Sequence, residues 1–225
     1  MKPFLAVQAL GREDPTNGKI DIVGSSFRLW SSNHFITAQH CVQNIEPSQL
    51  KIMNPLSDIH HFNCIAINRH AKADIAVLKV QGTVPEQLEK FKLSSKEATY
   101  GANIHCFGIM INLLETGAPA RVIGGIIQRD FTYKDGTYES AAFELSVPIP
   151  KGMCGGPAFF AHRDDTAIGV AIASIKSEVV VSGFEEYEND KLKEKERISE
   201  VTRYGVILNL HIVKVWLEEV MLKED

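Results

Sequence analysis

The sequence predicts an all-β protein, built as a sandwich or a pair of barrels, that ends in one α-helix. About a dozen short segments are rich in Val, Ile, Phe and Thr and are bounded by turn residues, which is typical of β-strands. Asn17-Gly18 and Asp135-Gly136 are dipeptides that favour tight hairpin turns. Few segments show helical spacing, so strands are expected to dominate. The expected strands are residues 3–9, 20–30, 34–38, 49–53, 60–68, 75–81, 103–110, 119–130, 138–147, 157–161, 167–182 and 203–209.

Three segments differ from this pattern. Residues 82–100 are polar and predict a linker between two halves of the chain. Residues 185–200 hold seven acidic and four basic side chains, and we interpret them as a solvated surface loop or a short exposed helix. Residues 210–222 place apolar side chains at helical spacing, which predicts an amphipathic helix packed on the β-structure. These apolar side chains are Leu210, Val213, Trp216, Leu217, Val220 and Met221.

Length and composition exclude several classes of protein. A chain of 225 residues can form one barrel or sandwich unit with a substantial core, and its 44% hydrophobic content is that of a globular protein. The net charge of −4, with basic residues spread along the chain, gives no sign of a nucleic-acid or membrane partner. Apolar runs reach only about eight residues, whereas a membrane-spanning helix needs about 20. The apolar start is short for a secretory signal, so we expect a cytoplasmic protein with reduced thiols.

The chain has four cysteines, Cys41, Cys64, Cys106 and Cys154, a count that allows two disulfides. Cys154 lies in the glycine-rich run at residues 151–157, KGMCGGP. Glycines let the backbone turn tightly and bring N–H groups close to a bound atom. A thiol in such a turn suits a nucleophile, with the amides of Gly152 and Cys154 forming an oxyanion hole.

This run also fits the nucleophile elbow of α/β-hydrolases with cysteine in place of serine. In those enzymes the acid and the histidine follow the nucleophile. The histidines after Cys154 are His162, in a polar turn, and His211, in the terminal helix segment. The residues after the glycines read as a strand, not a helix. Chain order therefore argues against both the hydrolase and the papain-like arrangement.

Two upstream segments supply partners for Cys154. Residues 35–42, FITAQHCV, place His40 just after a strand-like run, and residues 73–80, ADIAVLKV, place Asp74 at the head of an apolar strand. Together with the glycine-rich run, these segments resemble the chymotrypsin-like, or trypsin-like, peptidase family. That family carries its histidine in T-A-x-H-C, its aspartate in D-I-A-x-L and its nucleophile in G-x-S-G-G-P. The short spacings look most like HtrA-type bacterial members and viral 3C-like cysteine peptidases.

The resemblance implies a fold and a division of the chain. It implies two six-stranded antiparallel β-barrels and a C-terminal helix, with residues 1–90 forming the barrel of His40 and Asp74. Residues 91–225 would form the barrel of Cys154 and the helix 210–222. Residues 91–103 look like the inter-barrel connection of HtrA-type proteases, and residues 204–207 look like the last strand of the family. The resemblance therefore covers nearly the whole chain.

The resemblance also implies an activity. The chain is expected to be an endopeptidase in which His40 acts as general base, Asp74 orients it and Cys154 attacks the scissile carbonyl. No metal or organic cofactor is needed. A polypeptide bound as an extended strand would be the substrate, and a dedicated protein target or activator is a further expected partner.

The chain departs from the family at the nucleophile, which is Cys154 rather than serine. Two interpretations stay open. The cysteine is the native nucleophile, as in viral 3C-like enzymes, because a histidine-paired thiolate is reactive at neutral pH. Alternatively, it replaces the serine of a serine-type peptidase, which leaves a weak or inactive protein that serves as a binding or partner-activated module.

Two further departures concern activation and the disulfides. Met153 stands where digestive members carry an aspartate that binds a newly cut N-terminus, so activation by N-terminal cleavage is not expected. Cys41 follows the histidine as in disulfide-bonded relatives, but residues 22–26 offer no cysteine for it. We therefore expect Cys41 to be a buried free thiol, and Cys64 and Cys106 to be thiols inside the barrels.

The resemblance places a substrate pocket around five residues. Its floor would be Pro148, and its walls would include Ile172, Ala173, Ser174 and Gly205. No acidic residue stands at the floor, so a trypsin-like preference for Arg or Lys is not supported. We expect small or apolar residues before the scissile bond, with the acidic residues 185–188 favouring a basic residue elsewhere in the substrate.

Other candidate groups are interpreted as structural. His60, His61, Cys64 and His70 carry metal-binding side chains, but no second pair at zinc spacing accompanies them, so ordinary strand residues are expected. His34 precedes the strand that leads to His40, and we expect a surface histidine. The pair of glycines at 124–125 lacks the residues of a phosphate loop and predicts a bend at a barrel corner.

Overall fold

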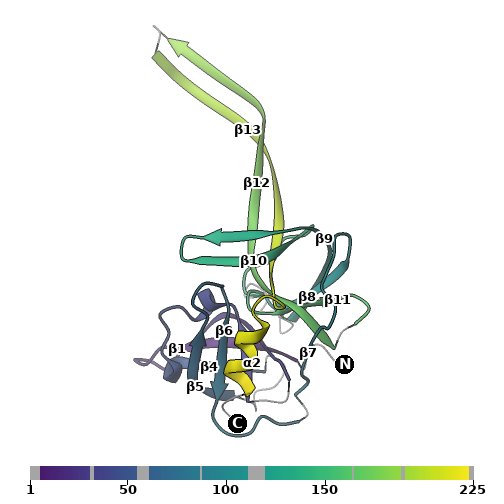
Figure 1. The fold of residues 1–225 in the computed structure, drawn as a ribbon. Helices are drawn as coiled ribbons and strands as arrows, with labels where there is room; N and C mark the ends of the chain where they lie inside the picture. The colour runs from purple at the N-terminus through teal and green to yellow at the C-terminus, as the bar shows by residue number, and fades with distance from the viewer. Residues whose placement is uncertain are drawn as a thin grey trace.

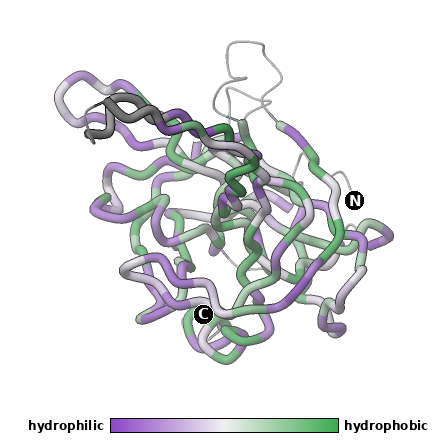
Figure 2. Tube along the Cα trace, turned by 90° about the horizontal axis from the view of Figure 1, so that it is seen from above, coloured by the Kyte–Doolittle hydropathy of each residue, from purple (hydrophilic) through white to green (hydrophobic). Residues whose placement is uncertain are grey.

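Two sheets, made almost entirely of antiparallel strands, account for most of the computed structural model (Figure 1). It describes residues 6–30, 33–54, 61–86, 88–110, 120–163, 165–188 and 191–222. The predicted strand at 3–9 therefore begins outside the described residues, and His60 also lies outside them. Hydrophobic and hydrophilic residues alternate along much of the chain, as expected of strands with one face in a core (Figure 2).

The first sheet closes into a barrel in the order β1-β2-β3-β6-β5-β4. Its interior is filled by large side chains such as Phe27, Phe35 and Ile52, all fully buried. Two 3₁₀ turns, η1 (Gln39–Val42) and η2 (Pro47–Gln49), connect β3 to β4. The strands are β1 (Val7–Glu13), β2 (Ile20–Arg28), β3 (His34–Thr37), β4 (Leu50–Met53), β5 (His61–Arg69) and β6 (Ala76–Val80).

The second sheet has the order β11-β8-β9-β10-β13-β12-β7, and pairing between β11 and β12 makes it barrel-like. The short strand β7 lies parallel to the start of β12. The predicted all-β fold of two barrels with one C-terminal helix is confirmed, except that the second sheet has seven described strands where six were expected, because the short strand β7 joins its edge. The strands are β7 (Lys92–Leu93), β8 (Asn103–Ile109), β9 (Ala120–Asp135), β10 (Tyr138–Leu145), β11 (Pro157–Phe160), β12 (Thr166–Glu188) and β13 (Lys191–Asn209).

The C-terminal helix α2 (Lys214–Leu222) returns the end of the chain to the first barrel. Leu217 and Met221 are fully buried and share a hydrophobic cluster with residues of that barrel. The Trp216 ring meets His70 edge-on, with centroids 5.0 Å apart. The helix begins four residues later than expected from the spacing, because residues 210–213 form a turn after β13.

The prediction of a loop or short helix at residues 185–200 is wrong. Strands β12 and β13 continue through this segment as a two-stranded ribbon that rises away from both barrels (Figure 1). Residues 176–188 and 191–203 of this ribbon are called the arm below. Charged residues dominate because both faces of a free ribbon meet water, so the usual apolar–polar alternation of a strand is missing. The arm also exposes Val179, Val180, Phe184 and Ile198.

Several local predictions are decided by burial. Cys41, Cys64 and Cys106 are buried free thiols, as expected. The prediction that His34 lies at the surface is wrong, because every residue of β3 is buried. This strand lies between β2 and β6 in the closed barrel, and its outward side is covered as well as its inward side.

No helix among the described residues is long and apolar enough to cross a membrane.

Candidate active site

His40 and Asp74 meet at one end of the first barrel. His40 lies in η1, directly after β3, and Asp74 lies in the turn that leads into β6. Because β3 and β6 are hydrogen-bonded neighbours, these two turns lie side by side. The Asp74 carboxylate accepts two hydrogen bonds from His40, one from the backbone N–H at 2.8 Å and one from Nδ1 at 2.7 Å. This pair of contacts orients the imidazole and leaves Nε2 directed away from Asp74.

The environment of His40 favours its charged form. Burial opposes the charge, but the interactions of the imidazole with Asp74, Cys154 and Cys41 outweigh it and raise the pKa of His40 above its usual value. The Asp74 side chain is only 3% exposed, whereas that of His40 is 36% exposed. An imidazole held in this way by a buried carboxylate, with its other face open to solvent, is suited to proton transfer.

Cys154 lies in the turn before β11, between the two barrels. Its thiol donates to the carbonyl oxygen of Ile172 at 3.5 Å, and its side chain lies close enough to His40 to contribute to the raised pKa of the imidazole. The Nε2 atom of His40 lies 3.5 Å from the Sγ atom of Cys41. All four cysteines fall within the described ranges, and Cys154 is the one that is partly exposed. The structure thus brings the three residues of the sequence motifs to one site, where Asp74 is hydrogen-bonded to His40 and the Cys154 side chain lies beside the imidazole.

The turn that carries Cys154 depends on glycine. Gly152 and Gly155 have φ values of +97° and +88°, in the region that side chains other than glycine rarely adopt. A Cβ atom on Gly155 would lie 2.1 Å from the Ser25 carbonyl oxygen and 2.3 Å from Thr37 Oγ1. The glycine-rich run is therefore required for the turn to fit against β2 and β3.

Ser25 on β2 anchors this turn, and sequence reasoning missed it. Its Oγ donates to the Gly152 carbonyl oxygen at 2.8 Å, and its backbone N–H donates to the Cys154 carbonyl oxygen at 2.8 Å. The same Oγ accepts the N–H of Ile109 at 2.8 Å. Ser25 is fully buried and belongs to the other barrel, 127 residues from Gly152. No local sequence signal distinguishes it from other strand serines.

The N–H groups of the turn divide into two sets. Met153, Gly155 and Gly156 donate to the carbonyl oxygens of Pro150, Ala171 and Met153, respectively. Within the described part of the chain, the N–H groups of Gly152 and Cys154 donate to no protein acceptor.

Met153 points away from this turn. Its side chain is fully buried in the core of the second barrel, where its atoms lie within 3.0 Å of the position that a Cβ on Gly108 would take.

The residues expected to form a substrate pocket lie on adjacent segments. Ser174 Oγ accepts the Ile149 N–H at 2.7 Å and donates to the Ile149 carbonyl oxygen at 3.0 Å. A Cβ on Gly205 would lie 2.7 Å from the Val147 carbonyl oxygen. The loop after β10 is thus held against β12 and β13. Pro148 is exposed in that loop, and Ala173 is half-buried.

A hairpin of the second barrel reaches the turn that carries Asp74, which sequence reasoning also missed. Strands β9 and β10 extend beyond their barrel, and Ser140 Oγ accepts the Asp74 N–H at 3.0 Å. The N–H of Glu139 donates to the Lys72 carbonyl oxygen at 2.9 Å. Burial raises the pKa of Tyr138, and the charge of Asp74 raises it further. This hairpin therefore ties the second barrel to the aspartate of the first.

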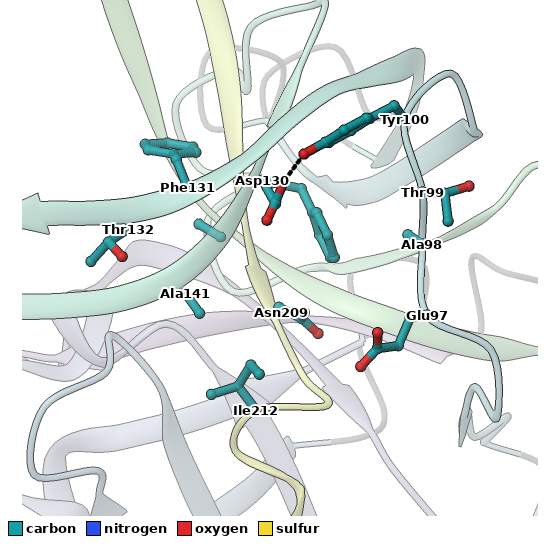
Figure 3. Close-up of a pocket in the computed structure, with 12 residues that line it drawn as sticks. Glu97, Ala98, Thr99, Tyr100, Asp130, Phe131, Thr132, Ala141, Asn209 and Ile212 are labelled. Atoms are coloured by element: carbon teal, nitrogen blue, oxygen red, sulfur yellow. Dashed lines mark hydrogen bonds between the residues drawn. The ribbon is translucent and has the colours of Figure 1, made fainter.

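A cavity of about 530 Å³ lies elsewhere, between the β9–β10 hairpin and the turn after β13 (Figure 3). The Tyr100 hydroxyl donates to the Asp130 carboxylate at its mouth, and Phe131 and Ile212 contribute apolar walls. None of the residues that line it is His40, Asp74 or Cys154. Among the described residues, no three His, Cys, Asp or Glu side chains gather as a metal site would require.

Known structures share this fold. The Rv3671c protease from M. tuberculosis in its active form has a TM-score of 0.65 and 14% identity, over 96% of this chain and 80% of that one. The MamO protease domain from Magnetospirillum magneticum has a TM-score of 0.65 and 17% identity, over 94% and 95%. The HtrA-type protease AlgW with a tripeptide has a TM-score of 0.66 and 15% identity, over 98% and 61%. At these identities the likeness shows the fold.

The sequence itself also matches a family. No protein of curated function matches it. Residues 24–170 match the trypsin-like peptidase domain, and this range contains His40, Asp74 and Cys154. Because the match spans well over half of the chain and agrees with the double-barrel fold, the chain belongs to the family of trypsin-like peptidase domains.

Proposed function

We propose that this chain is an endopeptidase that cleaves peptide bonds with Cys154 as nucleophile, His40 as acid and base, and Asp74 as the group that orients His40. The observation that carries the proposal is the His40 imidazole, which Asp74 orients through a hydrogen bond to Nδ1 and which lies beside the Cys154 side chain. A nucleophile, a base and a group that positions the base, each within hydrogen-bonding reach of the next, form the arrangement that activates weak nucleophiles.

The raised pKa of His40 favours a particular starting state. A protonated imidazole beside the thiol stabilises the thiolate, so the sulfur attacks without a separate deprotonation. The sulfur–carbon bond forms as the carbonyl π pair moves to oxygen. His40 then donates its proton to the leaving amine as the carbon–nitrogen bond breaks. Water, deprotonated by His40, hydrolyses the resulting thioacyl enzyme and restores the cysteine.

The amides of Gly152 and Cys154 are suited to hold the oxyanion. Neither donates to the protein within the described residues, and both belong to the turn that carries the nucleophile. One donor of this type typically contributes about 2.7–4 kcal/mol of transition-state stabilisation. The hydrogen bonds from Ser25 would keep the turn in this conformation without occupying either amide.

The substrate would lie across the segments that meet at Cys154. Ile172, Ala173 and Ser174 on β12 would pair with it as an added strand, and Pro148 and Gly205 would border the side chain before the scissile bond. None of these residues is acidic, which supports small or apolar residues at that position. No step of this chemistry requires a metal or an organic cofactor.

Alkylation and peptide cleavage together test the proposal. We expect iodoacetamide to label Cys154 well below pH 8, and His40→Ala to abolish that labelling. A peptide library should be cleaved by the wild-type chain and left intact by Cys154→Ala. Normal cleavage by Cys154→Ala would refute the proposal.

A comparison with Cys154→Ser separates the two interpretations of the cysteine. Activity only in the serine form would identify the natural chain as an inactive binding or partner-activated module. Met153 occupies the position where digestive members carry the activating aspartate, and it is buried in the core. This position therefore has no acidic group that could bind an activating N-terminus, which motivates the second function.

A further inference from the structure

Within the part of the chain that the structure describes, one edge of strand β12 has no partner strand along the arm. Strand β11 pairs with β12 only as far as Val170, and β7 pairs only with its first two residues. From Ala171 to Glu188, the strand that pairs with β12 in the described part of the chain is β13. An unpaired edge presents a row of free N–H and C=O groups, which is a template for a further strand.

This free edge begins at the nucleophile. The Ile172 carbonyl oxygen accepts the thiol of Cys154, so this carbonyl faces the site rather than β13. Backbone groups of successive strand residues point to opposite edges. The backbone groups of Ser174, Lys176, Glu178 and Val180 therefore face the same free edge. The register with β13 shifts between Ala171 and Ala173 and again between Val180 and Ser182, so the regular alternation runs from Ala173 to Val180.

We propose that the arm extends the substrate-binding edge, so that the substrate's residues N-terminal to the scissile bond pair with β12 for about nine positions. This inference rests on the proposed peptidase function and defines its substrate as a long, unfolded segment. An antiparallel strand beside β12, which runs from the barrel toward the arm tip, has its N-terminal side toward that tip. Antiparallel pairing is the more stable kind, and nearly every pairing in this fold is antiparallel.

The stability of the arm supports an added strand. A two-stranded ribbon alone is marginally stable in water, and a third strand with apolar contacts stabilises it. The arm leaves Val179 60% exposed and Phe184 57% exposed. A bound segment would cover part of this apolar surface and would pair with backbone groups that have no partner strand among the described residues.

The register predicts which substrate positions meet which side chains. With the residue before the scissile bond (P1) opposite Ile172, the third, fifth and seventh residues (P3, P5 and P7) lie opposite Ser174, Lys176 and Glu178. P4 and P8 then lie opposite Ile175 and Val179, on the same face of the ribbon. Apolar side chains are expected at P4 and P8.

Binding of modified peptides tests this register without needing turnover. The full chain with Cys154→Ala is titrated with fluorescent nine-residue peptides that end at P1. N-methylation of the P5 or P7 amide, which faces β12, should raise Kd by about 2- to 12-fold, the equivalent of one net hydrogen bond. N-methylation of P4 or P6, whose amides face away, should change Kd by less than twofold. Equal effects at odd and even positions would overturn the proposal.

Two variants of Glu178 provide a matched pair. Its N–H faces the free edge, so Glu178→Pro removes a donor to the substrate and keeps the ladder to β13. Glu178→Ala keeps that N–H and loses the same carboxylate. We expect that only Glu178→Pro weakens the binding of nine-residue peptides. The affinity for four-residue peptides should be unchanged in both variants. Equal affinity of the two variants for the long peptides would contradict the proposal.

A length series distinguishes this inference from the proposed function itself. Extension of a peptide from P4 to P9 should raise kcat/KM, whereas an equal extension beyond the scissile bond should not. A gain only from the second extension would overturn the inference and leave the peptidase function intact. Absence of all cleavage, with the alternating Kd pattern retained, would overturn the peptidase function and leave the binding edge. A concentration-dependent dimer abolished by Glu178→Pro would instead assign the edge to a second copy of this chain.

Discussion

The substitution Asp74→Asn isolates the contact that orients His40. Asp74 accepts the His40 backbone N–H on Oδ1 and the ring Nδ1–H on Oδ2. The asparagine oxygen can keep the first bond, but its NH₂ group then faces Nδ1. His40 would have to place its ring proton on Nε2, which is the atom that must accept the proton of the thiol. The change therefore removes one charge-assisted hydrogen bond and favours the wrong tautomer.

The lost hydrogen bond is of the charged kind, worth about 1.5–3 kcal/mol. Expressed as a rate, this predicts a fall in kcat of about 10- to 150-fold. The same aspartate-to-asparagine change in trypsin, whose nucleophile is a serine, lowers kcat by about 10⁴-fold. A smaller loss is expected here because a thiol beside a protonated imidazole ionises before attack, whereas a serine must lose its proton during it.

The assay is hydrolysis of a fluorogenic peptide, with circular dichroism and thermal unfolding to show that the variant folds. Asp21→Asn is the control, since Asp21 pairs with Lys19 at an exposed site on β2 with its side chain 66% exposed. It should leave kcat unchanged. A folded Asp74→Asn protein whose kcat lies within threefold of the wild type would refute the role given to Asp74.

Three further predictions concern the turn at Cys154 and the thiols. Gly155→Ala should destabilise the fold by more than about 2 kcal/mol in urea unfolding, because alanine would be strained at the left-handed φ of this position and its Cβ would clash with the Ser25 carbonyl oxygen; an unchanged urea midpoint would contradict the geometry. Ser25→Ala should lose about 1–3 kcal/mol of stability and lower kcat more than it raises KM, because it removes two buried hydrogen bonds, one to the Gly152 carbonyl oxygen of the turn and one from the Ile109 N–H of β8; Ser182→Ala on the arm is the control. Iodoacetamide at pH 7 should modify Cys154 alone in the folded chain, because burial raises the pKa of Cys41, that of Cys64 to about 11 and that of Cys106 to about 12; mass spectrometry showing equal labelling of all four thiols would contradict this burial.

The strands were largely predictable because their signals are local. The run at 20–30 folds as a strand over residues 20–28, and the run at 34–38 folds as a strand over residues 34–37. Asn17-Gly18 and Asp135-Gly136 mark turns, with Gly18 at φ +68° and Gly136 at φ +45°. In these segments, side-chain alternation and turn chemistry depend on near neighbours in the chain, so one sequence suffices to read them.

The arm and the buried histidine were not predictable in this way. The arm has water on both faces, so composition alone does not distinguish its strands from a loop. His34 is buried because β3 is covered on both sides, and nothing in its own segment reveals that cover. Ser25 and Ser140 act across the interface between the barrels, on residues far away in the chain.

The sequence by itself determined the β-rich fold, the order of its three motif segments and the glycines that the turn at Cys154 requires. These properties depend on residue type and short spacing. Only the tertiary structure decided how Asp74, His40 and Cys154 lie relative to one another, which serines hold them, and where β12 keeps an open edge. The physical reason is that these features arise from contacts between strands of different barrels, and such contacts depend on how the whole chain closes.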